Sequence, residues 1–159
     1  MRKIDLLLNE YGESHQDATN KTIHWICVPL IFLSVVGLIA SIPSQAVQSV
    51  LGWGNPYANW AGVLLVLVLL YYVTLSIPLS IGMALFGVLC LFVIELIVRA
   101  NIAPLWMVSL VIFFVAWVGQ FYGHKVEGKK PSFLKDIQFL LIGPAWLMHF
   151  IYKRLGIPY

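Results

Sequence analysis

The chain has 159 residues, of which 60% are apolar and 11% are charged, and its formal net charge is +3. Soluble domains are close to half apolar and a quarter charged, so this composition excludes an ordinary soluble domain and predicts an integral membrane protein. The length leaves room for one compact unit, and we expect a single helical membrane domain over residues 1–159.

The chain begins with the segment MRKIDLLLNEYGESHQ. Its apolar run of about four residues is too short for a cleavable signal peptide, which needs about seven or more. We therefore expect a surface helix over residues 3–13. The polar segment QDATN follows, in which Asp17, Thr19 and Asn20 favour caps and turns over helix interiors. The pattern predicts a break in the backbone before the first membrane span.

Four apolar stretches have about the length that a transmembrane helix requires, roughly 17 to 20 residues. Pro43 and Pro78 directly follow the first two stretches, and Pro104 precedes the fourth. The third contains Glu95 four residues before Arg99, which indicates an i,i+4 ion pair near a membrane interface, with a functional carboxylate as the alternative. The expected spans are residues 25–42, 60–77, 79–98 and 105–122.

A fifth apolar stretch, residues 137–152, is interrupted by Gly143 and Pro144. Its length suits a re-entrant or interfacial helix as well as a span, because an interrupted backbone is tolerated where it does not face lipid. The stretch by itself therefore leaves both arrangements open.

The distribution of basic residues favours one topology. Three lie within the first 21 residues and six follow His124, whereas the connection over residues 43–59 carries no charge. Because Lys and Arg favour the cytoplasmic side, four spans would place both termini there. A fifth span would move Lys153 and Arg154 outside, so we expect a tail helix that is re-entrant or lies at the interface.

Three of the four histidines are expected at the same cytoplasmic face. His15 and His24 lie before and at the mouth of the first span, and His124 follows the fourth. Nine residues separate His15 from His24, which would place them on opposite sides of one continuous helix, so they converge only if the backbone breaks between them. Converging imidazoles suit Fe, Zn, Cu or Ni. Histidines that only anchor the membrane interface are the alternative.

Polar side chains lie one helical turn from two of these histidines. Asn20 comes four residues before His24, and Gln120 comes four residues before His124. Glu127 lies one turn after His124, where a carboxylate can accept the second ring N–H of a ligating histidine. We therefore expect Asn20, Gln120 and Glu127 to orient the ligands or a bound water.

Several other classes of protein can be weighed from the residues alone. Cys27 and Cys90 lie in apolar segments and are expected to be small buried side chains without a disulfide. A membrane di-iron desaturase or hydroxylase needs more than the four histidines present. A haem-binding membrane protein with two axial histidines stays open, as does a non-enzymatic four-span lipid-binding protein or channel subunit.

Three blocks of the sequence resemble, in order, the motifs of the membrane 2-hydroxy fatty acid dioxygenase family. The first is HQDATNKTIHWICVP, the second is QFYGHKVEGKKP, and the third is FLLIGPAWL. One departure is Cys27, where many relatives have Gly. The shared positions are His15, Asn20, His24 and Pro29 in the first block and Gln120, His124, Glu127 and Pro131 in the second.

This resemblance implies an Fe(II)-dependent dioxygenase that cleaves the C1–C2 bond of a 2-hydroxy fatty acid and leaves an acid one carbon shorter. In the family this reaction is the α-oxidation step in degradation of the phytosphingosine long-chain base, and it is therefore part of sphingolipid degradation. The resemblance also implies that His15, His24 and His124 hold the iron. His149 lies outside the motifs. It is either a fourth ligand or a histidine at the membrane interface, and the resemblance leaves both open.

The implied partners are a 2-hydroxy fatty acid, O₂ and the lipid bilayer, and no nucleic acid is expected. The implied location is the bacterial inner membrane, or the endoplasmic reticulum in a eukaryote. Lysines near the expected site could attract the substrate carboxylate, or could serve only topology and lipid headgroups. They are Lys21, Lys125, Lys129 and Lys130.

Overall fold

The computed structural model describes residues 2–128 and 139–159, which form helices and turns with no strand among them. This agrees with the expected all-α class. Lys129, Lys130, Pro131 and the first two residues of the expected tail stretch lie outside the described residues. The helices are α1 (Lys3–Gly12), α2 (Ala18–Ala40), α3 (Gln45–Leu51), α4 (Trp60–Leu75), α5 (Ile77–Ala100), α6 (Leu105–Glu127) and α8 (Ile142–Leu155).

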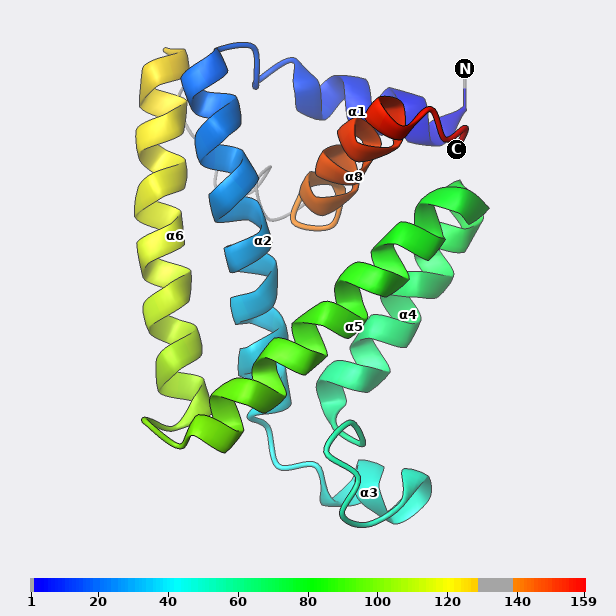
Figure 1. The fold of residues 1–159 in the computed structure, drawn as a ribbon, viewed down its shortest axis with the longest axis vertical. Helices are drawn as coiled ribbons and strands as arrows, with labels where there is room; N and C mark the ends of the chain where they lie inside the picture. Colours follow the sequence, from blue (N-terminus) through cyan, green and yellow to red (C-terminus); the bar gives the residue numbers. More distant parts are fainter. Residues whose placement is uncertain (1, 129–138) are drawn as a thin grey trace.

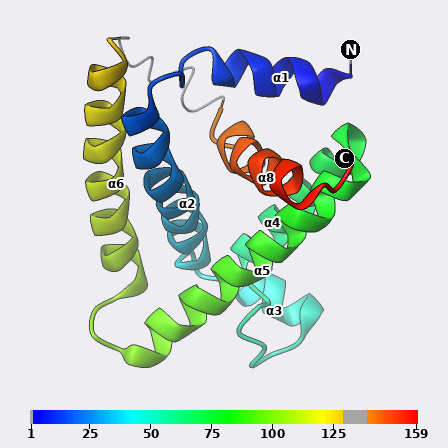
Figure 2. The ribbon, with the colours of Figure 1, turned by 45° about the horizontal axis from the view of Figure 1, so that its top comes forward.

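Two helix pairs dominate the architecture. Helices α2 and α6 lie side by side and antiparallel, and α4 and α5 form the second pair, with α5 crossing α2 obliquely (Figure 1). Helix α1 extends sideways from the start of α2, away from α6, and α8 packs against both α1 and α5 (Figure 2). Both termini therefore lie at the same end of the bundle.

Among the described residues, three helices, α2, α5 and α6, are long and apolar enough to cross a membrane. Helix α4 is also apolar but has only 16 residues, because Ser76 ends it and caps α5 by accepting a hydrogen bond from the Leu79 N–H. Pro78 thus lies in the first turn of α5, where its missing N–H removes no helical hydrogen bond. Three of the expected spans therefore have helices of spanning length, and the four-span topology stays a prediction.

The two helices that carry histidines extend beyond their apolar runs. Helix α2 begins at Ala18 instead of residue 25, because Asp17 caps it and lets the polar segment join the helix. Helix α6 continues to Glu127 instead of ending at residue 122. The expected spans followed hydropathy and mark only the apolar part of each helix, so the polar turns that carry His24 and His124 lie outside them.

The tail and one connection also differ from expectation. Gly143 and Pro144 lie in the first turn of α8 and do not interrupt it, since that turn tolerates proline. Helix α8 continues to Leu155, three residues past the expected end. The short helix α3 lies in the uncharged connection, where the sequence predicted no helix. Whether α8 is re-entrant stays a prediction.

Two smaller predictions are confirmed. The Arg99 Nε donates a hydrogen bond to Glu95 Oε1 at 2.8 Å, so these side chains form the expected i,i+4 ion pair. Cys27 and Cys90 are buried and form no disulfide. Neither feature points to a reactive site.

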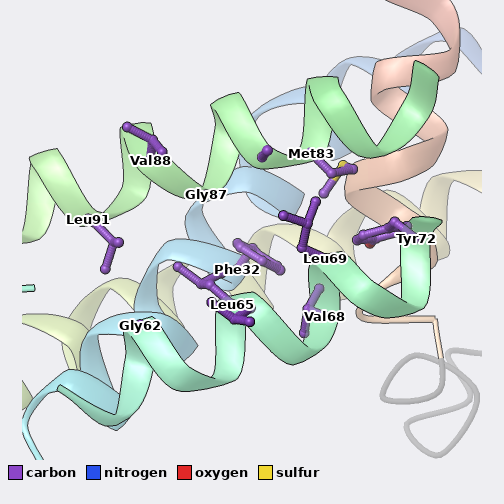
Figure 3. Close-up of a pocket in the computed structure, with 12 residues that line it drawn as sticks. Phe32, Gly62, Leu65, Val68, Leu69, Tyr72, Met83, Gly87, Val88 and Leu91 are labelled. Atoms are coloured by element: carbon purple, nitrogen blue, oxygen red, sulfur yellow. The ribbon is translucent and has the colours of Figure 1, made fainter. Parts of the chain in front are cut away.

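An apolar cavity of about 180 Å³ lies between α4 and α5, with Phe32 of α2 also lining it (Figure 3). Tyr72 is the one hydroxyl-bearing residue of its lining, and that hydroxyl donates to the Leu141 carbonyl. A site that performs polar chemistry needs convergent polar groups, and the described residues that line this cavity do not supply them. The chemistry must therefore be sought elsewhere in the bundle.

Candidate metal centre

Three histidines meet at the end of the α2–α6 pair. His15, His24 and His124 each offer a ring nitrogen, and these atoms all lie within 4.8 Å of one another. The residues are 3%, 1% and 5% exposed, respectively. Buried polar rings need partners, so three imidazoles gathered out of contact with solvent form a candidate ligand set for a metal ion.

The turn between α1 and α2 brings His15 against His24. The Asp17 carboxylate caps α2 by accepting hydrogen bonds from the Thr19 and Asn20 N–H groups at 2.7 and 3.1 Å. The backbone changes direction before this cap, so the two histidines do not share one helix. Their ring centroids lie 4.1 Å apart. The predicted break between them is confirmed.

Glu127, at the end of α6, holds this turn in place. Its carboxylate accepts hydrogen bonds from the backbone N–H groups of Gln16 and Asp17, both at 2.9 Å, and from Asn20 Nδ2 at 3.1 Å. Hydrogen bonds to a carboxylate are roughly twice as strong as neutral ones. Glu127 therefore joins the segment that carries His15 to the helix that carries His124. A hydrogen bond from the His124 ring to Glu127 stays a prediction.

Backbone carbonyl groups set the orientation of two rings. His15 Nδ1 lies 2.6 Å from the Tyr11 carbonyl oxygen, and His24 Nδ1 lies 2.9 Å from the Asn20 carbonyl oxygen. A carbonyl oxygen can only accept, so each Nδ1 carries a proton, which in the neutral ring leaves the lone pair on Nε2. Ligating histidines commonly use this arrangement, because the hydrogen bond fixes both the tautomer and the ring.

The donor set fits a single metal ion. Three imidazoles suit a first-row transition metal, and three protein ligands leave coordination positions for other molecules. A neighbouring cavity, lined partly by Val28 and Gln120, has a volume of about 30 Å³. That space is about the size of a water molecule, so it suits a small ligand.

Close contact between α2 and α6 depends on two glycines that the sequence analysis did not single out. A Cβ atom on Gly123 would lie 2.4 Å from Asn20 Oδ1, and one on Gly119 would lie 2.6 Å from Cys27 Sγ. Both distances are too short for any side chain. The signal was present as Gly-x-x-x-Gly in an apolar helix, a spacing that allows close helix packing in membranes.

Aromatic side chains close the site on the side of α1 and α8. The Tyr11 ring stacks on His15 with centroids 4.3 Å apart, and Trp146 lies 5.3 Å from the same ring. Both aromatic residues are buried. Neither was a predicted site residue, although Tyr11 comes four residues before His15, the same spacing that separates Asn20 from His24. Trp146 lies in the third sequence block, which was the available signal.

The two carboxamides have different surroundings. Asn20 is fully buried, and its Nδ2 donates to the Ser14 carbonyl as well as to Glu127. Its Oδ1 has no hydrogen-bond partner among the described residues. Gln120 is 7% exposed and lines the 30 Å³ cavity. Asn20 thus braces the turn, whereas Gln120 is available to a molecule beside the histidines.

His149 does not belong to the group of three. Its Nδ1 is hydrogen-bonded to the Tyr159 hydroxyl, and its ring lies against Phe150. Partial burial, together with the nearby Lys153 charge, lowers the pKa of His149 below its ordinary value. Of the predicted lysines, Lys21 is half-buried and Lys125 is exposed.

Comparison with known proteins agrees with the resemblance. No solved structure matches the chain. The chain is similar to the protein named 2-hydroxy-palmitic acid dioxygenase MPO1 of Saccharomyces cerevisiae, with 28% identity over 151 residues, covering 94% of this chain and 79% of the yeast protein. The family model described as 2-hydroxy-palmitic acid dioxygenase Mpo1-like matches residues 1–155. A match over almost the whole length shows that this chain belongs to the Mpo1-like family.

Proposed function

We propose that this protein is a non-haem, Fe(II)-dependent dioxygenase that shortens a 2-hydroxy fatty acid by one carbon. The observation that carries the proposal is the buried group of three imidazoles in a chain of the Mpo1-like family. The name of the yeast relative supplies the substrate class, 2-hydroxy-palmitic acid, which the proposal extends to this chain.

The proposed reaction balances without an added reductant. Cleavage of the C1–C2 bond oxidises C2 from an alcohol to a carboxylic acid and releases C1 as CO₂. This removes four electrons from the 2-hydroxy acid, and one O₂ accepts all four. The products are the shortened acid, CO₂ and water. A membrane desaturase or hydroxylase would instead need electrons from a second protein.

His15, His24 and His124 would hold the ion. When bound, Fe(II) would supply open coordination positions for the two substrate oxygens and for O₂. The chain's contribution is to fix the rings: carbonyl groups of Tyr11 and Asn20 hold the Nδ1 atoms of His15 and His24. The two rings would therefore need little rearrangement when the ion binds.

Two further groups would act on the substrate or on ligand position. Gln120 lines the cavity beside the histidines, and its amide would donate or accept a hydrogen bond at the 2-hydroxyl or at a water molecule. Glu127 and Asn20 would keep the His15 turn against α6 through their mutual hydrogen bond. Tyr11 and Trp146 would exclude bulk water from the reacting atoms.

The position of the site suits an amphiphilic substrate. The histidines lie at one end of α2 and α6, two helices of spanning length. A carboxylate and 2-hydroxyl at the membrane surface would reach the ion while the hydrocarbon chain stays among apolar helices. With this topology the site and both termini face the cytoplasm, of a bacterium or of a eukaryotic cell with the protein in its endoplasmic reticulum.

Metal analysis followed by product analysis tests the proposal. The purified protein is assayed for metal content, supplied with Fe(II), and incubated with 2-hydroxypalmitate in air. We expect about one iron per chain, uptake of O₂ and pentadecanoic acid by mass spectrometry. Palmitate, which lacks the 2-hydroxyl, is the control and should not react.

Other outcomes would select the remaining classes. A Soret band in the purified protein would indicate haem and contradict a non-haem centre. Absence of both stoichiometric metal and product would favour a non-enzymatic lipid-binding protein. Stoichiometric zinc with no turnover after iron loading would retain the metal centre and reject the oxygenase chemistry.

A further inference from the structure

We propose that the groove between the start of α2 and the outer face of α8 is a docking site for the free carboxylate of a long-chain fatty acid. The groove is open, with a volume of about 680 Å³. It is separate from the three histidines and from the cavity that Gln120 lines. The inference rests on the proposed function only in its final step, delivery of the acid to the metal centre.

Cations from two helices line this groove. Lys21 comes from α2, and Lys153 and Arg154 come from the last turn of α8. No Asp or Glu is among the described residues that line it. A concave surface with three positive charges and no acidic partner favours an anion, and a carboxylate can take two hydrogen bonds from Arg154.

The rest of the groove is apolar. Trp25 is 40% exposed and Leu155 is 65% exposed, and Phe150 lies beside Trp25 with ring centroids 6.4 Å apart. Cations beside exposed aromatic and aliphatic side chains match an amphiphile with one charged end and one hydrocarbon chain. A small inorganic anion would leave the apolar half of the groove uncovered.

A series of aromatic contacts connects the groove to the metal centre. Phe150 packs edge-on against Trp146 with centroids 4.7 Å apart, and Trp146 lies 5.3 Å from His15. On the other wall, Lys21 precedes His24 by three residues on the same helix. The groove thus lies about one helical turn from the ligands, with aromatic side chains between.

This connection is why we assign a free fatty acid and not a phospholipid. A free acid presents the same carboxylate that the proposed reaction consumes, and it can leave the groove and move past Phe150 and Trp146. A phospholipid carries two chains and has no step at the metal. Initial docking at the cations and later transfer would raise the local concentration of substrate at the site.

Photo-crosslinking tests the docking site without relying on turnover. The full-length protein in neutral-lipid nanodiscs is incubated with a palmitate that carries a diazirine, irradiated and analysed by mass spectrometry. We expect crosslinks on peptides that contain Trp25 and Leu155. The double variant Lys153→Gln/Arg154→Gln should reduce them about fivefold, since two exposed charge contacts are removed. Lys3→Gln, which removes one exposed charge at the same end of the bundle, is the control.

Kinetics give a second readout. In the double variant, KM for 2-hydroxypalmitate should rise about fivefold with kcat within twofold of the unmodified protein, because an interaction outside the reacting centre stabilises substrate and transition state equally. Added salt should raise the KM of the unmodified protein more than that of the double variant. A parallel loss of kcat would place these cations in the chemical step and overturn the docking role.

Three crosslinking results would overturn the proposal. Equal loss in Lys3→Gln would indicate general surface charge. Displacement by phosphatidylglycerol but not by palmitate would indicate a phospholipid site. Crosslinks located elsewhere would indicate a different route. If no 2-hydroxy acid is turned over but the crosslinks behave as expected, the proposed function fails while the fatty-acid groove stands.

Discussion

The α2–α6 pair and the α4–α5 pair are both apolar along most of their length, but the helices of the first pair pack more closely than those of the second. Helices α2 and α6 approach so closely that Gly123 leaves no room for a Cβ beside Asn20. Between α4 and α5 there is a cavity of about 180 Å³, and a Cβ on Gly87 would meet Leu65 at an ordinary 3.5 Å.

The ends of the two pairs explain the difference. Helices α2 and α6 continue past their apolar runs, and their polar turns carry His24, His124 and Glu127. Helix α4 ends at Leu75, directly before the cap of α5. In this bundle, the polar side chains of the candidate site therefore lie where helices extend beyond their apolar runs, and close packing of α2 against α6 holds them there.

Removing a ligand should have the largest effect on this comparison. His24→Ala and His124→Ala should lose both bound iron and turnover, because two imidazoles leave a weak site. Iron content by mass spectrometry and product formation measure the two effects. His149→Ala is the matched control and should keep its iron. Full iron and full activity in either of the first two variants would reject the metal centre.

Adding one methyl group to each helix pair tests whether α2 and α6 pack more closely than α4 and α5. Gly123→Ala places Cβ against Asn20 Oδ1, and we expect about 1–3 kcal/mol of destabilisation together with reduced iron binding. Gly87→Ala should be neutral or slightly stabilising, since alanine favours helix more than glycine does. Thermal unfolding in detergent and iron content report both. A neutral Gly123→Ala variant would show that the two pairs pack alike.

Removing one carboxylate charge from each helix pair tests the hydrogen bonds between Glu127 of α6 and the turn that carries His15. Glu127→Gln keeps one acceptor oxygen but loses the charge and part of three hydrogen bonds, so iron affinity should fall about 10- to 100-fold. Glu95→Gln breaks an exposed ion pair and should leave iron binding and melting temperature unchanged. Iron titration compares them. Equal affinities in the two variants would contradict the bracing role of Glu127.

The smallest predicted effect lies in the α4–α5 pair. Tyr72→Phe leaves the Leu141 carbonyl without its hydroxyl donor and should cost about 1 kcal/mol of stability. Iron content and kcat should not change, because this group is part of the packing around the apolar cavity. Loss of iron at normal stability would show that the two helix pairs are coupled.

Much of the candidate site followed from local pattern. The break at Asp17, the stripe from Asn20 to His24 and the stripe from Gln120 to His124 all depend on helix geometry and capping over a few residues. The expected spans stopped short of the outer ends of α2 and α6, because hydropathy detects only the apolar part of a helix. The Gly-Pro in the tail was misread because proline is tolerated in the first turn of a helix.

The amino-acid sequence by itself determined an all-helical chain with apolar helices of spanning length and histidines at the ends of two of them, because composition, helix periodicity and capping act between near neighbours. Only the tertiary structure decided that the imidazole nitrogens approach within 4.8 Å, that Glu127 holds the turn of His15, and that Trp146 covers it. Apart from that between His15 and His24, these contacts join the start of the chain to α6 and α8, and their formation depends on how whole helices pack.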